Sequence, residues 1–286
     1  MGKYEEFLEH KSRLDPPTGL VDKLSLPKQL FQFQHDITRW SLRRGRAAVF
    51  AQTGLGKSFI ELSWGDAIHS STGGNILLLT PPAVGPQMVR EGIKFGIQST
   101  LCASQEDVIP GVNITNYEKL HLFDLSKFIG VILDESSILK SFDGKTHTML
   151  IKSCAHIPYR LACSATPAPN DFTELGNHAE FLGVMDLANM LAVFFAHDGE
   201  NTSQWRLKGY AEDNFWRWMC SWAVLLRHPR DLGYEDSRYD LPPLHQHEHI
   251  VPMSGPRALT LSQRLAARRE SIDQRVAKAV ELTPGR

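Results

Sequence analysis

The stretch VFAQTGLGKSF (residues 49–59) decides the fold that this sequence predicts. A short apolar run ends here and is followed at once by glycines, a lysine and a serine. Glycines allow a loop to turn its backbone N–H groups toward one point, and a helix that begins after the loop adds its positive N-terminal end. The stretch therefore predicts a strand, a loop that wraps a phosphate group, and a helix.

The loop AQTGLGKS (residues 51–58) matches the phosphate-loop pattern G-x-x-x-x-G-K-[ST] at its last three positions, with Ala51 in place of the first glycine. Lys57 would reach the β- and γ-phosphates of ATP, and Ser58 would hold Mg²⁺. A glycine turn with an incidental lysine is the alternative. The loop residues expected to bind the ATP–Mg²⁺ cofactor are Thr53, Gly54, Gly56, Lys57 and Ser58.

The composition limits the class of protein. A chain of 286 residues suggests about two domains, and 31 basic against 32 acidic residues give no overall basic signal for nucleic acid. No apolar run approaches the roughly 20 residues of a membrane span, so we expect a cytoplasmic protein with no membrane partner. No CxxC pair exists among the four cysteines, which favours isolated buried thiols: Cys102, Cys154, Cys163 and Cys220.

Short β-rich runs alternate with stretches that can form helices. The runs are residues 47–51, 75–80, 112–115, 130–135 and 159–165. This alternation predicts an α/β fold, a P-loop NTPase with a doubly wound parallel sheet, whose ligands bind at the carboxyl ends of the strands. After about residue 183 the chain is rich in Trp and Phe at helical spacing, and residues 261–282 read as a charged amphipathic helix, so we expect a C-terminal helical extension.

Two adjacent carboxylates, Asp134 and Glu135, end the apolar run GVILDE. Carboxylates beside a buried strand are costly unless a cation accompanies them. In an NTPase the first would hold Mg²⁺ and the second would position the attacking water, so both are candidate catalytic residues with Lys57. An isolated DE pair is more often a solvated turn, but the phosphate loop upstream favours the metal site.

The motifs together resemble the first RecA-like domain of superfamily 2 helicases, and among them the Swi/Snf-related DNA translocases. LFQFQHDITRW (residues 30–40) resembles the adenine-binding segment, which implies that Gln34 reads the adenine edge with Phe33 beside it. LLLTPPAVGPQMVREGIKF and NITNYEKL resemble motifs on the nucleic-acid face of that family. The nucleic-acid contacts that this implies are Thr80, Pro81, Thr115 and Asn116.

Two further segments carry the same resemblance. LDESSILKS resembles the DEAD/DEAH box, but Ser136 and Ser137 are its third and fourth letters, so the His or Asp that often links the nucleotide to the next motif is absent. CSATPAPNDFTELGNHAEFL resembles that next motif, which implies that Ser164 and Thr166 couple the nucleotide site to the nucleic acid. The tail around residues 215–244 resembles phage and prophage helicase-like proteins.

The resemblance implies a domain order and a function. Residues 1–28 would be an N-terminal extension, 29–184 the RecA-like ATP-binding domain, and 185–286 a helical extension toward a second RecA-like domain, in cis or in trans. The chain would be an ATP hydrolase that moves along DNA through phosphate contacts with little sequence preference. Its ATP hydrolysis would be slow in the chain alone, because the second domain supplies the arginines that stabilise the γ-phosphate during transfer. Alternatives are a restriction-modification motor subunit, a half-helicase that only binds a partner, and, less favoured, a P-loop kinase.

Three further patterns have ordinary explanations. HQHEHI places His245, His247 and His249 at alternate positions, but no cysteine or carboxylate constellation supports a metal site. A local basic cluster is expected to be a solvated helix end: Arg39, Arg43, Arg44 and Arg46. Four tryptophans at near-helical spacing are expected in a core: Trp205, Trp216, Trp218 and Trp222. The arginines at 264, 268 and 269 are expected on a solvated face.

Overall fold

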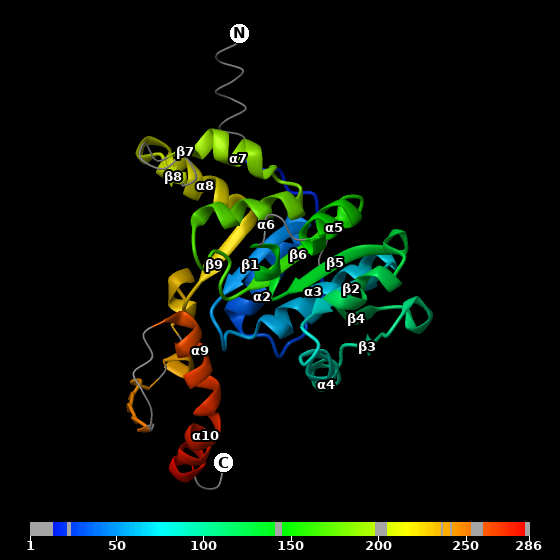
Figure 1. Ribbon diagram of the computed structural model, residues 1–286. Coiled ribbons are helices and arrows are strands. Elements are labelled where there is room, and N and C mark those ends of the chain that lie inside the picture. Colours follow the sequence, from blue (N-terminus) through cyan, green and yellow to red (C-terminus); the bar gives the residue numbers. More distant parts are fainter. Residues whose placement is uncertain are drawn as a thin grey trace. The chain divides into compact units, whose positions relative to one another are not determined.

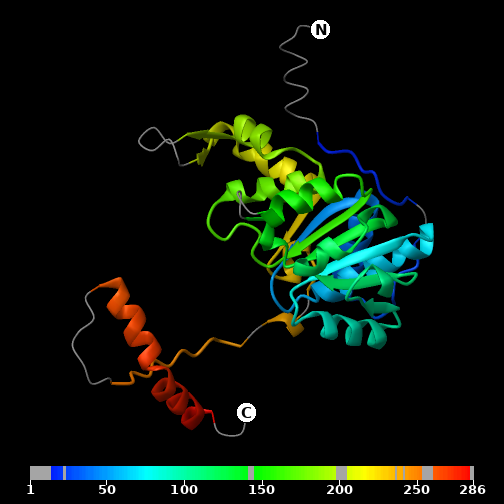
Figure 2. The ribbon, with the colours of Figure 1, turned by 45° about the vertical axis from the view of Figure 1, so that its right-hand side comes forward.

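The computed structural model describes residues 14–21, 24–140, 145–197, 205–235, 237–240, 242–252 and 260–283. The chain divides into two compact units, Met1–Asp240 and Leu241–Arg286. The first unit is built on a central β-sheet with helices on both faces, which Figures 1 and 2 show from two directions. It contains all of the motifs that predict function.

Seven parallel strands form the sheet, in the order β3-β4-β2-β5-β6-β1-β9. Their bounds are Arg46–Ala51 (β1), Asn75–Thr80 (β2), Ser99–Leu101 (β3), Val112–Asn116 (β4), Phe128–Asp134 (β5), Tyr159–Ser164 (β6) and Ala223–Leu226 (β9). Cys163 of β6 pairs with Val49 on one side and with Asp134 on the other. Because the strands are parallel, the loops after β1, β5 and β6 leave the sheet at one common edge.

Side chains alternate between the two faces of the sheet, as the period of two residues in a strand requires. On β1, Val49 belongs to one buried cluster and Phe50 to the other. The first face is covered by α2 (Gln32–Arg44), α3 (Lys57–Thr72) and α4 (Gly85–Phe95). The other is covered by α5 (Lys145–Cys154), α6 (Leu175–Leu182), α7 (Leu187–Phe194) and α8 (Glu212–Trp222). This two-sided cover confirms the predicted doubly wound α/β fold.

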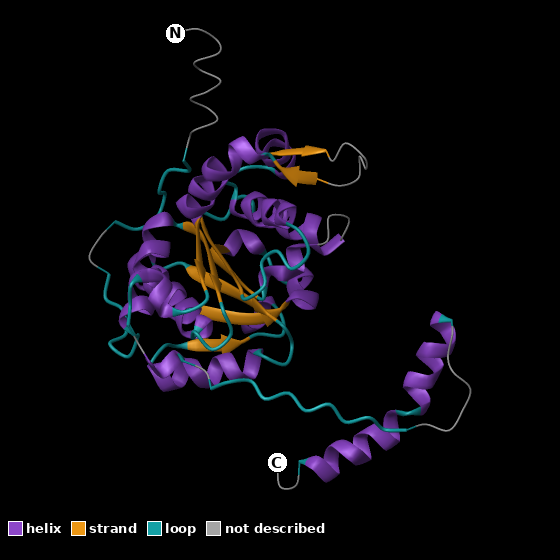
Figure 3. Cartoon of the chain, turned by 90° about the vertical axis from the view of Figure 1, so that its left-hand side faces the viewer, coloured by secondary structure: helices purple, strands orange, loops and turns teal. Residues whose placement is uncertain are grey.

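The region after residue 184 differs from the wholly helical extension that the sequence predicts. β9 adds to the main sheet beside β1, and β7 (Phe195–His197) pairs antiparallel with β8 (Trp205–Leu207), the separate pair of strands in Figure 3. The run AVLL of β9 is only four residues long and directly follows an amphipathic helix, so its apolar residues continue the helical pattern. The first unit therefore extends to Asp240, beyond the expected boundary at residue 184.

The expected aromatic core is present where α8 packs on the sheet. Trp218 and Trp222 are buried with their ring centroids 5.2 Å apart, whereas Trp205 and Trp216 are half-buried at the margin of the same cluster. The second unit contains α9 (Leu261–Glu270) and α10 (Ile272–Leu282), and α9 carries the three expected exposed arginines, residues 264, 268 and 269. Within the described residues, no helix is long and apolar enough to cross a membrane.

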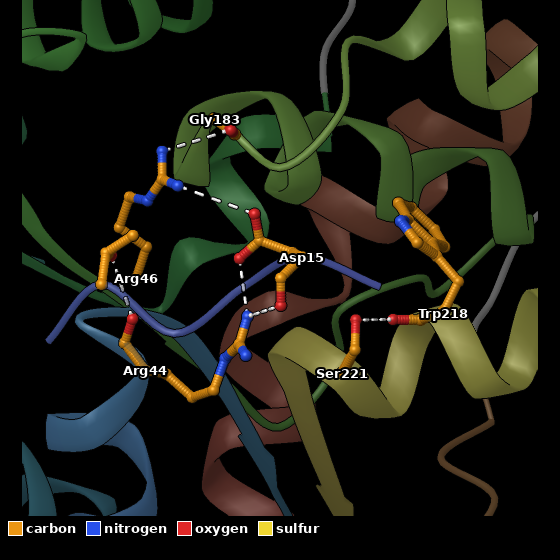
Figure 4. Close-up of polar contacts among 7 residues, drawn as sticks. Asp15, Arg44, Arg46, Gly183, Trp218 and Ser221 are labelled. Carbon is orange, nitrogen blue, oxygen red and sulfur yellow. Dashed lines mark hydrogen bonds and ion pairs between the residues drawn. The ribbon is translucent and has the colours of Figure 1, made fainter. Parts of the chain in front are cut away.

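The basic cluster near the end of α2 is not the solvated helix end that the sequence predicts. Asp15 lies between Arg44 and Arg46, at 2.6 Å and 3.6 Å, and Arg46 also donates to the carbonyl of Gly183 (Figure 4). The segment around residues 18–20 then runs along the end of α2, where three of its backbone N–H groups donate to carbonyls of residues 42–44. The cluster therefore fixes the N-terminal segment to the sheet, and only Arg43 is fully exposed.

Candidate functional site

The phosphate loop joins β1 to α3 through two left-handed glycines. Gly54 has φ 90° and Gly56 has φ 75°, a region that side chains with a Cβ rarely adopt. A Cβ on Gly56 would also lie 2.3 Å from Nε2 of Gln34. Thr53 and Gly54 are exposed, and Lys57 and Ser58 are half-buried in the first turn of α3. The loop thus has the open, glycine-dependent form that phosphate binding requires.

Lys57 and Asp134 share one edge of the sheet. Nζ of Lys57 donates to the carbonyl oxygen of Ala51 at 2.9 Å, which holds the ammonium group over the end of β1. Asp134 ends β5 and is 6% exposed. Burial raises the pKa of the Asp134 carboxyl, and the nearby Lys57 charge is one of the interactions that lower it. Two residues far apart in sequence are therefore close enough to interact with one bound group.

Two hydroxyl groups from neighbouring strands hold Asp134. Oγ1 of Thr80, at the end of β2, donates to Oδ2 of Asp134 at 2.7 Å. The hydroxyl of Tyr117, which follows β4, donates to the Asp134 backbone carbonyl at 2.6 Å. Thr80 was expected on the nucleic-acid face, but its hydroxyl points to the carboxylate and the residue is only 1% exposed. Asp134 is thus bonded to Thr80 through its carboxylate and to Tyr117 through its backbone carbonyl.

Glu135 has an unusual backbone conformation. Its φ of 54° makes it the single non-glycine residue with positive φ in the described part of the chain. Such strain is found most often at functional sites, where the surrounding structure maintains it. Oγ of Ser164 lies 3.4 Å from Oε2 of Glu135, and the backbone N–H of Thr166 donates to Oγ of Ser164 at 3.0 Å. Ser164 and Thr166 therefore connect the loop after β6 to the second carboxylate.

Gln34 links α2 to the phosphate loop. Its Nε2 donates to the carbonyl of Leu55 at 3.0 Å, and its Oε1 accepts from the N–H of Phe31. Phe33, expected beside the adenine, is 1% exposed and packs in the core. Phe31 instead shows an exposed ring, with the Arg238 guanidinium 4.3 Å from its centroid. Sequence reasoning missed Phe31, although it lies only three residues before Gln34.

The buried interior near the carboxylates contains two titratable residues that the motifs did not identify. Glu61, fully buried in α3, has a pKa raised well above its ordinary value, first by burial and then by the charge of Asp134. His178, fully buried in α6, has a pKa lowered to about 4, chiefly by burial. Its Nε2 lies 3.1 Å from Oγ of Ser136. In the sequence, the one signal for Glu61 and His178 is the unusual placement of a titratable residue among the apolar residues of a helix.

Two cavities lie on the side of β2 and β4, and the second of them borders Glu135. One of about 280 Å³ is lined by the predicted nucleic-acid residues Thr80, Pro81, Thr115 and Asn116, together with Lys119. The second, of about 310 Å³, shares Pro81 with it and reaches Tyr117 and Glu135. Thr115 is 2% exposed, so its side chain offers little surface to a ligand. Pro81, Asn116 and Lys119 give the first cavity its accessible wall.

The residues at this edge fit a magnesium ion. Asp134 is a buried carboxylate, and a cation would offset the cost of its burial. Ser58, the other expected ligand, lies in the first turn of α3 beside Lys57. Among the described residues, no cluster of three or more His, Cys, Asp or Glu could hold a metal by itself, and the three histidines of HQHEHI are exposed. An ion here would depend on oxygen ligands and phosphate, as Mg²⁺ does.

No protein-family model and no curated protein sequence matches the chain. Solved structures do. The SWI2/SNF2 ATPase core of Sulfolobus solfataricus, solved in complex with double-stranded DNA, superposes with a TM-score of 0.57 at 14% identity over 73% of this chain. The UvsW helicase of bacteriophage T4 gives 0.46 at 18% identity over 64% of this chain and 66% of its own. The Hef helicase domain of Pyrococcus furiosus gives 0.46 at 14% identity, over 56% and 39%.

The first of these comparisons carries the fold assignment. This chain spans 46% of the length of the Sulfolobus ATPase core, less than half of that protein. The chain therefore has a RecA-like α/β fold, similar to that of the Sulfolobus ATPase core.

Proposed function

We propose that the chain is the ATP-binding, Mg²⁺-dependent motor domain of a superfamily 2 DNA translocase. One observation carries this proposal: Lys57, after the glycine loop that follows β1, and the adjacent carboxylates Asp134 and Glu135, at the end of β5, come together at one edge of the sheet. A P-loop kinase would need the first two residues. It would not need the contact from Ser164 to Glu135, which links the loop after β6 to the carboxylates.

Each side chain has a defined task in this function. Lys57 binds the β- and γ-phosphates, and Asp134 and Ser58 hold the magnesium ion, which neutralises charge on the phosphates when bound. Glu135 orients the attacking water and accepts its proton. The two acidic groups have different partners, since Asp134 accepts from Thr80 whereas Glu135 accepts from Ser164, which fits two different tasks.

DNA binds on the side of β2 and β4. Pro81, Asn116 and Lys119 line the cavity there, and Lys119 supplies a positive charge for a phosphate. Contacts to phosphates carry little sequence information. Binding releases counterions from the DNA, and this release becomes less favourable as the salt concentration rises, so the affinity should fall with ionic strength. The Sulfolobus protein was solved with double-stranded DNA, which supports DNA as the ligand here.

A second RecA-like domain completes the motor, in this chain's natural context or in another chain. Arginines from such a domain stabilise charge during phosphoryl transfer and contribute factors of about 10³–10⁵ in rate. A cavity of about 570 Å³ beside Gln52, Thr166 and Arg227 gives that domain a surface next to the phosphate loop. The isolated chain is therefore expected to bind ATP and to hydrolyse it slowly.

The decisive experiment measures ATPase turnover of the purified chain with and without DNA, and with and without a supplied second RecA-like domain. We expect Mg²⁺-dependent ATP binding, slow basal turnover, and stimulation when both additions are present. ATP binding that DNA never influences would instead identify a nucleotide-dependent interaction protein. Absence of ATP binding would reject the proposal entirely.

A further inference from the structure

Thr80 and Tyr117 connect the carboxylate Asp134 to the walls of the candidate DNA cavity. The Thr80 hydroxyl donates to the Asp134 carboxylate at 2.7 Å and the Tyr117 hydroxyl to its backbone carbonyl at 2.6 Å. Both bonds are buried and span 54 and 17 residues of sequence. Neither hydroxyl is available to DNA, so the two residues serve the carboxylate from elements that belong to the DNA side.

The elements that carry these hydroxyls continue directly into the cavity wall. Pro81 follows Thr80 and lines both cavities, and Asn116 precedes Tyr117 and lines the first. The side chain of Asn116 accepts from the N–H of Lys119 at 3.0 Å, which ties the cation of the cavity to the same short helix, Tyr117–Leu122. A ligand that orders this wall thereby orders the two donors of Asp134.

From this arrangement we infer that Thr80 and Tyr117 are positioning residues that couple DNA binding to the magnesium–nucleotide site. Bound DNA phosphate fixes the loops after β2 and β4, which hold the Asp134 carboxylate in one orientation. A carboxylate that is already oriented binds Mg²⁺–nucleotide more tightly, because less ordering remains to be done on binding. By linkage, Mg²⁺–nucleotide must strengthen DNA binding by the same factor.

This inference rests on the proposed function and adds a second route to it. Ser164 and Thr166 reach Glu135, whereas Thr80 and Tyr117 reach Asp134. The two routes meet at adjacent residues but come from opposite sides of β5 in the sheet, one from β6 and the other from β2 and β4. Loss of one route therefore leaves the other intact, which makes the inference separable from the role given to Ser164.

The test compares DNA affinity with and without Mg²⁺–ADP, measured by fluorescence anisotropy of a short labelled duplex. For the unaltered chain we expect Mg²⁺–ADP to tighten DNA binding about tenfold, within the usual range of coupling between two sites. In Thr80→Val and in Tyr117→Phe the tightening, taken as the ratio of each variant's own affinities with and without Mg²⁺–ADP, should fall below about threefold.

Matched variants separate coupling from damage to the fold. Thr80→Ser keeps a hydroxyl at the same position and should retain the full tightening, whereas Thr72→Val and Tyr159→Phe remove hydroxyls away from both cavities and should also retain it. The Mg²⁺ concentration that gives half-maximal ADP binding should rise in Thr80→Val. It should stay unchanged in Thr80→Ser and in Thr72→Val. Each variant's thermal unfolding is recorded to confirm that it folds.

The outcomes distinguish this inference from the proposed function. Suppose that the unaltered chain binds Mg²⁺–ADP and DNA. If the coupling persists in Thr80→Val and Tyr117→Phe, or is absent from every protein, then Thr80 and Tyr117 do not couple the two sites, and the proposed motor function stands. If the unaltered chain binds no Mg²⁺–nucleotide, the proposed function fails and this inference fails with it.

Discussion

Nε2 of His178 lies 3.1 Å from the hydroxyl of Ser136, the residue that directly follows the Asp134–Glu135 pair. The other ring nitrogen, Nδ1, faces the backbone carbonyl of Glu174 at 3.4 Å. A carbonyl can only accept, so Nδ1 carries the proton and Nε2 accepts from Ser136. Ser136 takes the third position of the box, and α6 brings a neutral histidine to it from 42 residues away.

This burial predicts a specific dependence of stability on pH. The pKa of His178 is lowered to about 4 by burial, whereas in the unfolded chain it returns to 6.5. Between these values the unfolded state binds more protons, so the free energy of unfolding falls as the pH falls below 6.5 and continues to fall toward 4. At pH 5 the loss that this residue causes should be about 2 kcal/mol.

Urea unfolding of the unaltered chain and of His178→Gln, each at pH 7.5 and pH 5, measures this contribution. The variant lacks the titrating ring, so its stability should fall by about 2 kcal/mol less over the same interval. Carboxylates titrate alike in both proteins and cancel in the difference. Equal losses in the two proteins would show that His178 is not held neutral by burial.

Lys57→Ala should abolish ATP binding. The ammonium group lies at the end of β1, half-buried over the glycine loop, and is the cation expected on the β- and γ-phosphates. A thermal shift induced by ATP–Mg²⁺ in the unaltered chain should disappear in the variant. Lys152→Ala, an exposed lysine of α5, is the control and should keep the shift. A shift that survives in Lys57→Ala would place the triphosphate elsewhere.

Glu135→Gln should separate binding from turnover. The amide keeps the size of the side chain and can still contact Ser164, but it cannot accept a proton from the attacking water. We expect ATP affinity within about twofold of the unaltered chain and residual turnover reduced by about 10²-fold or more. Both are measured on the same preparation, with nucleotide binding by calorimetry and phosphate release over hours. Unaltered turnover would reject the role given to Glu135.

The parts of the fold that follow from local pattern were predicted from sequence. β2 has the expected bounds, and the other four expected strands differ from theirs by one or two residues at an end, because continuous apolar runs mark buried parallel strands. The glycines of the phosphate loop were also predictive, because residues 54 and 56 both adopt the left-handed φ that favours glycine. The short β9 was missed because four residues after a helix carry too little periodicity to separate strand from helix.

The parts of the site that depend on distant partners were not predicted. Thr80 was expected at the DNA surface because its segment resembles a family motif, but its hydroxyl is 2.7 Å from a carboxylate 54 residues away. Phe33 was expected beside the adenine, but it is 1% exposed, whereas Phe31 is 36% exposed. In both cases the direction of the side chain was decided by the tertiary fold.

The basic cluster of residues 39–46 shows that the burial of a charged side chain also depends on partners distant in sequence. Four arginines within eight positions read as a solvated face, yet Arg44 has a side chain only 10% exposed because Asp15, 29 residues upstream, neutralises it. Charge patterns in sequence omit partners at long range, and a single carboxylate can reverse the expected burial of a cation.

Asp15→Asn tests the ion pairs of Figure 4. The Asp15 side chain is 8% exposed between Arg44 and Arg46, and the charge of Arg160 acts on it as well. Arg160 has a pKa lowered to about 10, chiefly by burial and then by the charge of Arg46. Without the anion their repulsion is uncompensated, so the free energy of unfolding should fall by about 2 kcal/mol.

Urea denaturation at neutral pH measures that loss, and Asp213→Asn, an exposed aspartate of α8, should change stability by less than about 0.5 kcal/mol. Because Asp15 lies at the amino ends of β1 and β6, opposite the carboxyl ends where Lys57 and Asp134 meet, ATP affinity should be the same in Asp15→Asn as in the unaltered chain. A stability equal to that of Asp213→Asn would mean that the N-terminal segment is held by its backbone hydrogen bonds to α2 alone.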